Sequence, residues 1–462
     1  MSAVLAGVVV YVLVQFVIGA WVSRRMSGET DYILAGRSLG VTLVTFSVFA
    51  TYFGAEAIVA TGGSVYEKGL TGALVDPFGY AFAILLTGLL LARALWTRGL
   101  TTFADLFRQR YSPGVERLVV AVLLPGSIIW AAAQVRAFGQ VMSANSSLGL
   151  LTAITLAAVL VGAYSVVGGL LADAVTDTIQ GVAVLAGLII LGAAVAIHLG
   201  GVSAGLAQVQ ADKLALFEAD DSLIDILERC AVPICGTLIA VELISRFLGA
   251  RSANVAVIGT SLGGLIYLTV GVIPIFLGLV GPMLLPEVDE TEQAVAKLAE
   301  VFLPGALHVA FVGAIVSAIL SSVHAALHAP AAQISHNVIV RVLPGLTERG
   351  KLWSVRLTVL TLSVVAYVIA ATSHGIHELV ETASAFGGAG VFVVTLFALF
   401  TNFGGAKSAY VSVTAGLLLW LAGKYIVGFP APYLTSLVSS LIAYVGVALV
   451  EVRLQRQTIT SA

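Results

Sequence analysis

Apolar runs long enough to cross a lipid bilayer recur along the whole chain. Each holds about 20 residues, the length that an α-helix needs to cross roughly 30 Å of hydrocarbon. Inside lipid, such a run satisfies its backbone hydrogen bonds only as a helix. The sequence therefore predicts an all-α polytopic membrane protein, a single membrane domain over residues 1–462 with about thirteen transmembrane helices. The predicted spans are residues 3–22, 41–63, 73–96, 118–143, 148–169, 175–199, 223–248, 253–281, 304–329, 352–373, 378–401, 406–427 and 433–452.

Composition supports this fold class and excludes others. The 462 residues are 59% hydrophobic and only 10% charged, whereas a soluble domain carries roughly 25% charged residues. The net charge of −2 offers no basic surface for nucleic acid. Cys230 and Cys235 match neither a disulfide framework nor a metal-binding spacing. The lipid bilayer, and not a nucleic acid, is the expected partner.

The distribution of basic residues predicts the orientation in the membrane. Arg24 and Arg25 directly follow the first span, and basic residues concentrate in cytoplasmic loops. With the N-terminus outside, the great majority of Lys and Arg residues fall in cytoplasmic loops. Only Lys68, Lys213, Arg229, Lys297 and Lys424 fall in the opposite loops. We therefore expect a multi-pass protein of the plasma (inner) membrane, with its N-terminus outside and its C-terminus cytoplasmic.

The second span contains a glycine and a carboxylate, Gly54 and Glu56, where a membrane helix is normally apolar. A charge at the bilayer centre costs roughly 2.5–3.5 kcal/mol on insertion scales. An unwound helix exposes backbone carbonyls, which is tolerated only where they line a site. Glu56 is therefore expected to face a cavity or a partner. The alternative is a Gly/Ala packing face beside a neutralised Glu56.

The seventh span is also interrupted, by the segment 230–236 and then by Glu242. Two interrupted spans placed five apart are the pattern that two inverted five-helix repeats require. This spacing predicts a first repeat over residues 41–199 and a second over 223–401. The helices at 3–22 and 406–452 would then be peripheral.

Two adjacent hydroxyls, Ser321 and Ser322, occupy the ninth span. Neighbouring helix positions are about 100° apart, so both can flank one point beside the helix. Serines in membrane helices often bond their own backbone carbonyls. Alternatively, both are oxygen ligands for a small hard cation, completed by carbonyls of a broken helix. Asp177, which follows the turn at Gly168-Gly169, is expected near the start of a helix that it either caps or stabilises.

Five segments of the chain together resemble the sodium/solute symporter family, which has the LeuT-type inverted-repeat fold. The matching segments are residues 31–40, 50–56, 168–180, 246–252 and 318–322. The resemblance implies a 5+5 repeat with one extra N-terminal and two extra C-terminal helices. It also implies a sodium ion bound by the carbonyls of Ala50, Phe53 and Ala318 and the hydroxyls of Ser321 and Ser322, with Asp177 behind them.

Some members of the family bind a second sodium ion through hydroxyls slightly further along the same helix. His324 and Ala325 stand at those positions here, so the resemblance leaves a second sodium site open. His324 is either a neutral packed side chain or a group that titrates near physiological pH and makes transport pH-sensitive.

Four short segments narrow the resemblance within the family, namely residues 50–52, 77–80, 130–133 and 168–170. In these segments the chain is most similar to the high-affinity choline transporters. This similarity implies an aromatic box of Tyr52, Tyr80 and Trp130, whose faces attract a quaternary ammonium by about 1–2 kcal/mol each. The chain departs from the choline transporters at Ala240 and Val241, where they carry a tryptophan. Aromatic residues are also ordinary packing residues of membrane helices. The remaining substrate-binding candidates are Glu56, Asp76, Gln134 and Glu242.

The leading hypothesis is a sodium-coupled symporter that imports a small organic solute by alternating access. Choline or another small amine is the first candidate substrate, and a zwitterion such as proline or betaine, a sugar or a carboxylate is the alternative. A channel is the rival class, but no filter-like repeat or charged pore ring is visible. No metal-ligand cluster or nucleophile motif indicates an enzyme. A nutrient sensor built on a transporter scaffold is the last alternative.

Overall fold

The computed structural model describes residues 3–23, 28–54, 56–144, 146–218, 220–288, 290–373 and 375–460. In these ranges every regular element is a helix, and the single β-bridge joins Leu39 to Ala250. The all-α prediction is confirmed.

The elements follow one another with short connections, and the η elements are 3-10 or π-helical turns. Up to residue 110 they are α1 (Ala3–Ser23), α2 (Glu29–Leu34), η1 (Ala35–Arg37), α3 (Val41–Tyr52), η2 (Glu56–Ala60), α4 (Thr61–Lys68), η3 (Gly69–Ala73), η4 (Leu74–Gly79), α5 (Tyr80–Leu86), η5 (Thr87–Leu91), α6 (Ala92–Trp96) and α7 (Asp105–Arg110). Up to residue 302 they are α8 (Pro113–Ala144), α9 (Leu150–Val167), α10 (Leu170–His198), α11 (Val202–Leu206), η6 (Ala211–Leu214), α12 (Leu223–Leu238), α13 (Val241–Leu248), α14 (Ala253–Leu284), η7 (Thr291–Gln293) and α15 (Ala294–Phe302). The last are α16 (Gly305–Gln333), η8 (Ile334–Ile339), α17 (Val340–Val342), α18 (Glu348–Thr372), α19 (Ile376–Ala385), α20 (Gly388–Phe400), α21 (Ala406–Ala422), η9 (Gly423–Val427) and α22 (Pro432–Thr460).

Ten helical segments of the described chain are long and apolar enough to cross a membrane. Three shorter apolar helices, Leu13–Val22, Val41–Tyr52 and Leu150–Val166, lie where three further spans are predicted. The protein is thus a multi-pass membrane protein, and the number of thirteen crossings stays a prediction.

The second predicted span is interrupted where the sequence indicates. α3 ends at Tyr52, Phe53 has non-helical dihedral angles (φ −82°, ψ 61°), and the helix resumes at Glu56. The last carbonyls of a helix have no partner in a following turn. Because Ala50 and Phe53 are almost fully buried, this break presents backbone oxygens to the interior of the bundle.

The seventh predicted span is interrupted later than the sequence indicates. We expected the interruption at residues 230–236, but α12 continues to Leu238 and the extended residue is Ala240 (ψ 119°). Pro233 is accommodated inside α12, and its ring packs against Gly79, where a Cβ would lie 2.9 Å from the Pro233 Cγ. The break places Glu242 in the first turn of α13.

Two further helix boundaries differ from the prediction. α10 begins at Leu170, directly after Gly168-Gly169, and not near residue 175. Asp177 therefore lies in the second turn of the helix or beyond, and it cannot be its N-cap. The span predicted over 378–401 is divided at Phe386 and Gly387, where Gly387 has a positive φ of 70°. This third break brings α19 and α20 together at an angle near the site described below.

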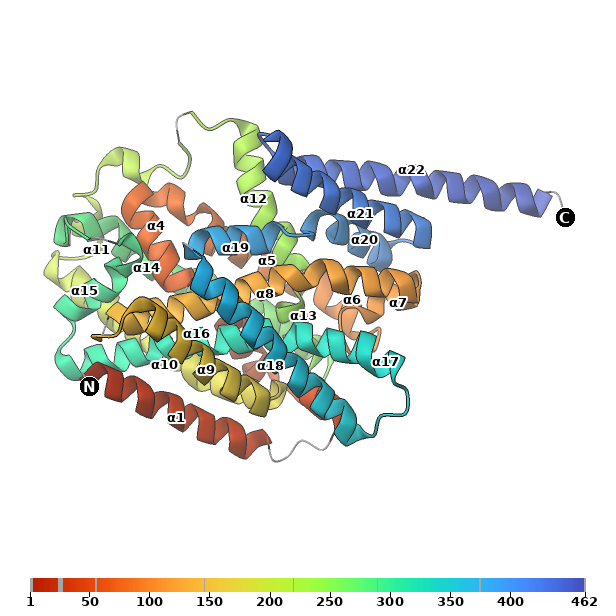
Figure 1. Ribbon diagram of the computed structural model, residues 1–462. Coiled ribbons are helices and arrows are strands. Elements are labelled where there is room, and N and C mark those ends of the chain that lie inside the picture. The colour runs from red at the N-terminus through yellow and green to blue at the C-terminus, as the bar shows by residue number, and fades with distance from the viewer. Residues whose placement is uncertain are drawn as a thin grey trace.

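The broken span α3 lies at the centre of the bundle. It contacts α10, α13, α14 and α16, and α16 also packs against α8 and α18. Figure 1 shows α1 along one edge of the bundle and α21 with α22 along the opposite edge. The central helices therefore position the residues that the sequence marks as functional.

Candidate functional site

The paired serines of α16 face the break of α3. The Ser322 Oγ lies 3.2 Å from the Ala50 carbonyl oxygen and 3.3 Å from the Ala318 carbonyl oxygen. The bond to Ala318 is the bond to its own helix that is common for serines in membrane helices. The contact with Ala50 joins a different helix, and that interpretation does not predict it. Ser321 and Ser322 are both fully buried. The Ser322 hydroxyl thus contacts both the interrupted helix α3 and its own continuous helix α16.

Asp177 of α10 lies behind this pair. The Ser321 hydroxyl donates to Asp177 Oδ1, and the Ser47 hydroxyl donates to Asp177 Oδ2 at 2.7 Å. Asp177 is fully buried. The carboxylate therefore reaches the cluster of oxygens through Ser321, which is the indirect position that the sequence analysis assigns to it.

Gly54 closes the cluster on the side of the break. A Cβ at this position would collide with the Ser322 Oγ and would lie 3.2 Å from Gln134 Oε1. The glycine is required here because no side chain fits between α3 and α16. Neutral carbonyl and hydroxyl oxygens with one carboxylate nearby are the ligand type that small hard cations prefer. The residues present therefore fit a sodium ion carried as a substrate.

A second buried cluster of charges adjoins this region. Arg246 of α13 forms an ion pair with Asp173, and its Nη1 lies 3.8 Å from Asp177 Oδ2. The His324 Nδ1 lies 2.9 Å from Asp173 Oδ1. His328 stacks on His324 with ring centroids 5.3 Å apart. The charge of Arg246 is thus held by carboxylates of α10, which ties α10, α13 and α16 together.

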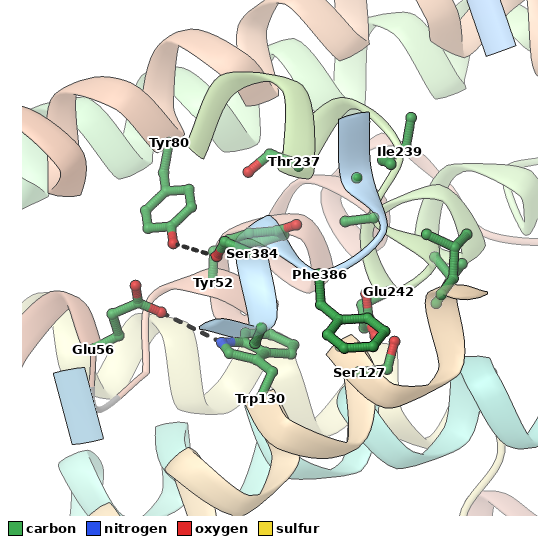
Figure 2. A pocket seen from close by; sticks show the side chains of 17 residues that line it. Tyr52, Glu56, Tyr80, Ser127, Trp130, Thr237, Ile239, Glu242, Ser384 and Phe386 are labelled. Carbon is green, nitrogen blue, oxygen red and sulfur yellow. Dashed lines mark hydrogen bonds between the residues drawn. The ribbon is translucent and has the colours of Figure 1, made fainter. Parts of the chain in front are cut away.

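The three predicted aromatic residues meet in one cavity beyond the break of α3. The ring centroids of Tyr52 and Trp130 are 5.7 Å apart, and those of Tyr52 and Tyr80 are 5.9 Å apart. The cavity encloses about 70 Å³, and Thr237, Ser384 and Phe386 also line it. These side chains come from α3, α5, α8, α12 and the break between α19 and α20, as Figure 2 shows in part.

Two buried carboxylates line the same cavity. Glu56 accepts a hydrogen bond from Trp130 Nε1 at 3.3 Å, and it is 6% exposed. Glu242 is 5% exposed, and its Oε1 has no hydrogen-bond partner. Figure 2 shows Glu56 beside Trp130, and Glu242 beside Ser127 and Phe386. The cavity therefore has aromatic walls and two carboxyl groups that do not lie side by side.

A larger cavity of about 270 Å³ lies next to the first one and shares Glu56, Tyr80 and Ser384 with it. The Tyr80 hydroxyl and the Ser384 hydroxyl, 3.1 Å apart, join α5 to α19 where the two cavities meet. Asp76 lines the larger cavity, and its Oδ1 accepts a hydrogen bond from the Tyr267 hydroxyl at 2.7 Å. We call this space the vestibule.

The cation that lines the vestibule, Arg229, is already paired. It forms an ion pair with Asp221. The hydrogen bond that Arg229 donates in this pair holds the pKa of the Asp221 carboxyl below its ordinary value. At the opposite end of the central helices, the cavity lined by His328 and Gln333 encloses only about 10 Å³. The described chain therefore has a large cavity on the vestibule side and almost none on the side of His328.

The structure brings most of the predicted substrate residues together but separates two. Asp76 lines only the vestibule, and Gln134 lines neither cavity but points to Gly54 and the oxygen cluster. The prediction missed Ser127, Ser384 and Phe386. Gly387-Gly388 inside an apolar run was the signal for the last two, since paired glycines allow a span to bend there.

Comparison with known proteins gives one family and a consistent set of relatives. The profile described as "Sodium:solute symporter family" matches residues 32–416. The high affinity choline transporter 1 of Homo sapiens is 26% identical over 465 aligned positions, which cover 94% of this chain and 78% of that protein. The high-affinity choline transporter 1 of Caenorhabditis elegans is 30% identical over 208 positions, which cover 43% of this chain and only 36% of that relative.

A solved structure has the same fold over nearly the whole chain. It is described as the substrate-bound outward-open state of a Na+-coupled sialic acid symporter. Its TM-score is 0.85, and the match covers 97% of this chain and 98% of that one. The sequences are 16% identical, so this likeness shows the fold alone.

Proposed function

The chain belongs to the sodium:solute symporter family, and from this membership we propose that it imports a small organic cation together with sodium. The observation that carries the proposal is the aromatic cavity with buried Glu56 and Glu242, placed directly beyond the break of α3. Tyr and Trp faces attract a desolvated organic cation, and a carboxylate supplies its counter-charge.

Sodium would bind between α3 and α16. The carbonyls of Ala50, Phe53 and Ala318 and the hydroxyls of Ser321 and Ser322 would be its ligands. The distances from Ser322 to Ala50 and Ala318 support this assignment. A bound ion would hold α3 against α16, and so fix the position of Tyr52 and Glu56 on either side of the break. In this way ion binding would prepare the substrate cavity.

Alternating access would follow from the inverted repeats over 41–199 and 223–401. The interruptions of α3 and of α12–α13 at matching places in the two repeats support this division. With thirteen spans, an outside N-terminus and a cytoplasmic C-terminus, the vestibule would face outward in the plasma (inner) membrane. The described chain would then be the state that receives sodium and substrate from outside.

The composition of the cavity favours a cation over the other candidate solutes. A sugar needs a polar partner for each buried hydroxyl, whereas this cavity offers mainly aromatic faces and carboxylates. The carboxylate of a zwitterion would lie between Glu56 and Glu242, which repel it. Choline and related small amines are therefore the first compounds to test, in line with the choline-transporter relatives.

The test is uptake by the purified full chain in proteoliposomes. Labelled choline is offered with an inward sodium gradient, with potassium in place of sodium, and with betaine, proline, glucose or pantothenate as competitors. We expect saturable, sodium-dependent uptake that only amines inhibit. Inhibition by glucose or pantothenate without any effect of amines would contradict the substrate class and leave sodium coupling intact.

A further inference from the structure

Two buried carboxyl groups line the substrate cavity, and a singly charged substrate can pair with only one of them. Glu56 and Glu242 both line it, and both are almost fully buried. Among the residues that the structure describes, no Lys, Arg or His nitrogen lies within the 4.0 Å limit of an ion pair with either carboxylate. Burying an unpaired carboxylate is costly, so each carboxyl carries a proton in the empty cavity or pairs with a cation that enters it.

Within the described part of the chain, the arginines nearest to these carboxyls form their ion pairs with other acids. Arg246 lies one helical turn after Glu242, but it is bound to Asp173 and lies 3.8 Å from Asp177. At the vestibule, Arg229 is bound to Asp221. Arg246, the arginine nearest to Glu242 in the sequence, and Arg229, the arginine at the vestibule, are thus each paired with another acid.

The two carboxyl groups do not lie side by side in the cavity. Figure 2 shows Glu56 beside Trp130, and Glu242 beside Ser127 and Phe386. The rings of Tyr52, Trp130 and Phe386 line the cavity together with them. A single compact ammonium group at one carboxylate would leave the other buried and unpaired, which is strongly unfavourable. A methylene chain between two ammonium groups would instead lie along apolar ring faces.

We propose that this cavity is built for a linear organic dication, such as an α,ω-diamine, with one ammonium at Glu56 and the other at Glu242. This inference rests on the proposed function, because it specifies which organic cation the same cavity takes. Glu56, shared with the vestibule, would receive the trailing ammonium, and Glu242 the leading one. Asp76 in the vestibule would add negative charge along the entry path and attract dications first.

The test is calorimetric binding to the purified full chain in sodium-containing buffer. The ligands are diamines from 1,3-diaminopropane to 1,6-diaminohexane, the monoamines of equal length, and choline. We expect the best diamine to bind at least tenfold more tightly than its matched monoamine. Glu242→Gln should abolish this advantage, so that the diamine and its matched monoamine bind the variant with affinities within about threefold of each other. Glu300→Gln, at an exposed position of α15, is the matched control and should bind as the unchanged protein does.

A second variant keeps the charge and changes only its position. Glu242→Asp shortens the side chain by one methylene, so the diamine that binds best should be longer by about one methylene. This shift remains informative if Glu242→Gln fails to fold. Equal binding of diamines and monoamines, or a diamine advantage that Glu242→Gln leaves unchanged, would overturn the dication inference and leave the proposed cation symport standing. Binding of glucose or pantothenate with no binding of any amine would overturn both.

Discussion

The oxygen cluster between α3 and α16 and the aromatic cavity beyond it lie on either side of one helix break, yet they differ in their chemistry. The cluster consists of neutral carbonyls and hydroxyls, with Asp177 reached through Ser321. The cavity has aromatic walls and two carboxylates that face it directly. A cation that must leave as easily as it enters suits the first set, and an organic cation that sheds its water suits the second.

The single break of α3 can thus serve both the sodium ion and the organic substrate. Ala50 precedes it and its carbonyl contacts the Ser322 hydroxyl, whereas Tyr52 and Glu56 flank it and present side chains to the cavity. Coupling between ion and substrate then needs no long pathway, because both would hold the same few residues of α3. Substitutions should separate the two regions, except at the break itself.

Gly54→Ala should have the largest effect, because it removes the space between the two regions. The added Cβ would collide with the Ser322 Oγ, so α3 and α16 would be forced apart. We expect sodium-driven uptake to fall at least 100-fold, measured in proteoliposomes at equal protein content. Gly446→Ala, where a Cβ meets nothing within 4 Å, should transport normally. Full activity of Gly54→Ala would contradict the close approach of the two helices.

Ser322→Ala should raise the sodium concentration for half-maximal uptake at least tenfold. The variant loses the hydroxyl that contacts the Ala50 carbonyl, while a small apolar side chain is well tolerated in the helix. Expression and the substrate KM at saturating sodium should change little. Ser363→Ala on α18, whose hydroxyl bonds only its own helix at Val359, is the control. An unchanged sodium requirement would show that this hydroxyl is not a ligand.

Trp130→Ala should raise the substrate KM about tenfold and leave the sodium requirement nearly unchanged. It removes a ring face, worth about 0.5–2 kcal/mol to a cation, and the N–H that donates to Glu56. Trp130→Phe keeps a face and loses only the N–H, so it should recover part of the affinity. If Trp130→Ala altered sodium affinity as strongly as substrate affinity, the two regions would not be separable.

Asp177→Asn should have the smallest effect of the four. Its carboxylate acts on the cluster through Ser321 and Ser47, and an amide can still accept their hydrogen bonds. We expect a rise of about three- to fivefold in the sodium concentration for half-maximal uptake. Ser47→Ala should give a similar or smaller change. A loss of folded protein with normal sodium affinity in the remainder would instead assign Asp177 a purely structural role.

The sequence was most informative where polar or charged side chains stand in segments that otherwise suit lipid. Glu56 beside Gly54, and Ser321 beside Ser322, stand out in apolar runs because a buried charge or paired hydroxyls need partners there. For this reason the α3 break and the residues around it could be predicted. The aromatic trio came from the resemblance to choline transporters, and in the structure it lines one cavity.

Other features depend on how the helices pack, which local pattern does not encode. The ion pair of Arg246 with Asp173 joins positions 73 residues apart, and several other acids were equally plausible partners. Pro233 and Cys230 indicated a break too early, because Gly79 opposite makes room for the proline inside α12. Gln134 shares a helix face with Trp130, but its Oε1 lies close to Gly54 and not in the aromatic cavity.

The hydrogen bond between the Tyr80 and Ser384 hydroxyls lies where the vestibule meets the aromatic cavity. A neutral hydrogen bond contributes only about 1 kcal/mol, so thermal motion should break it often and let solutes pass from the vestibule into the aromatic cavity. The opposite side is different, since His328 there stacks on His324, which binds the Asp173 of the buried Arg246 pair. A buried ion pair that loses one partner destabilises a protein by about 3–5 kcal/mol. We therefore expect the vestibule side to open more readily than the side of His328.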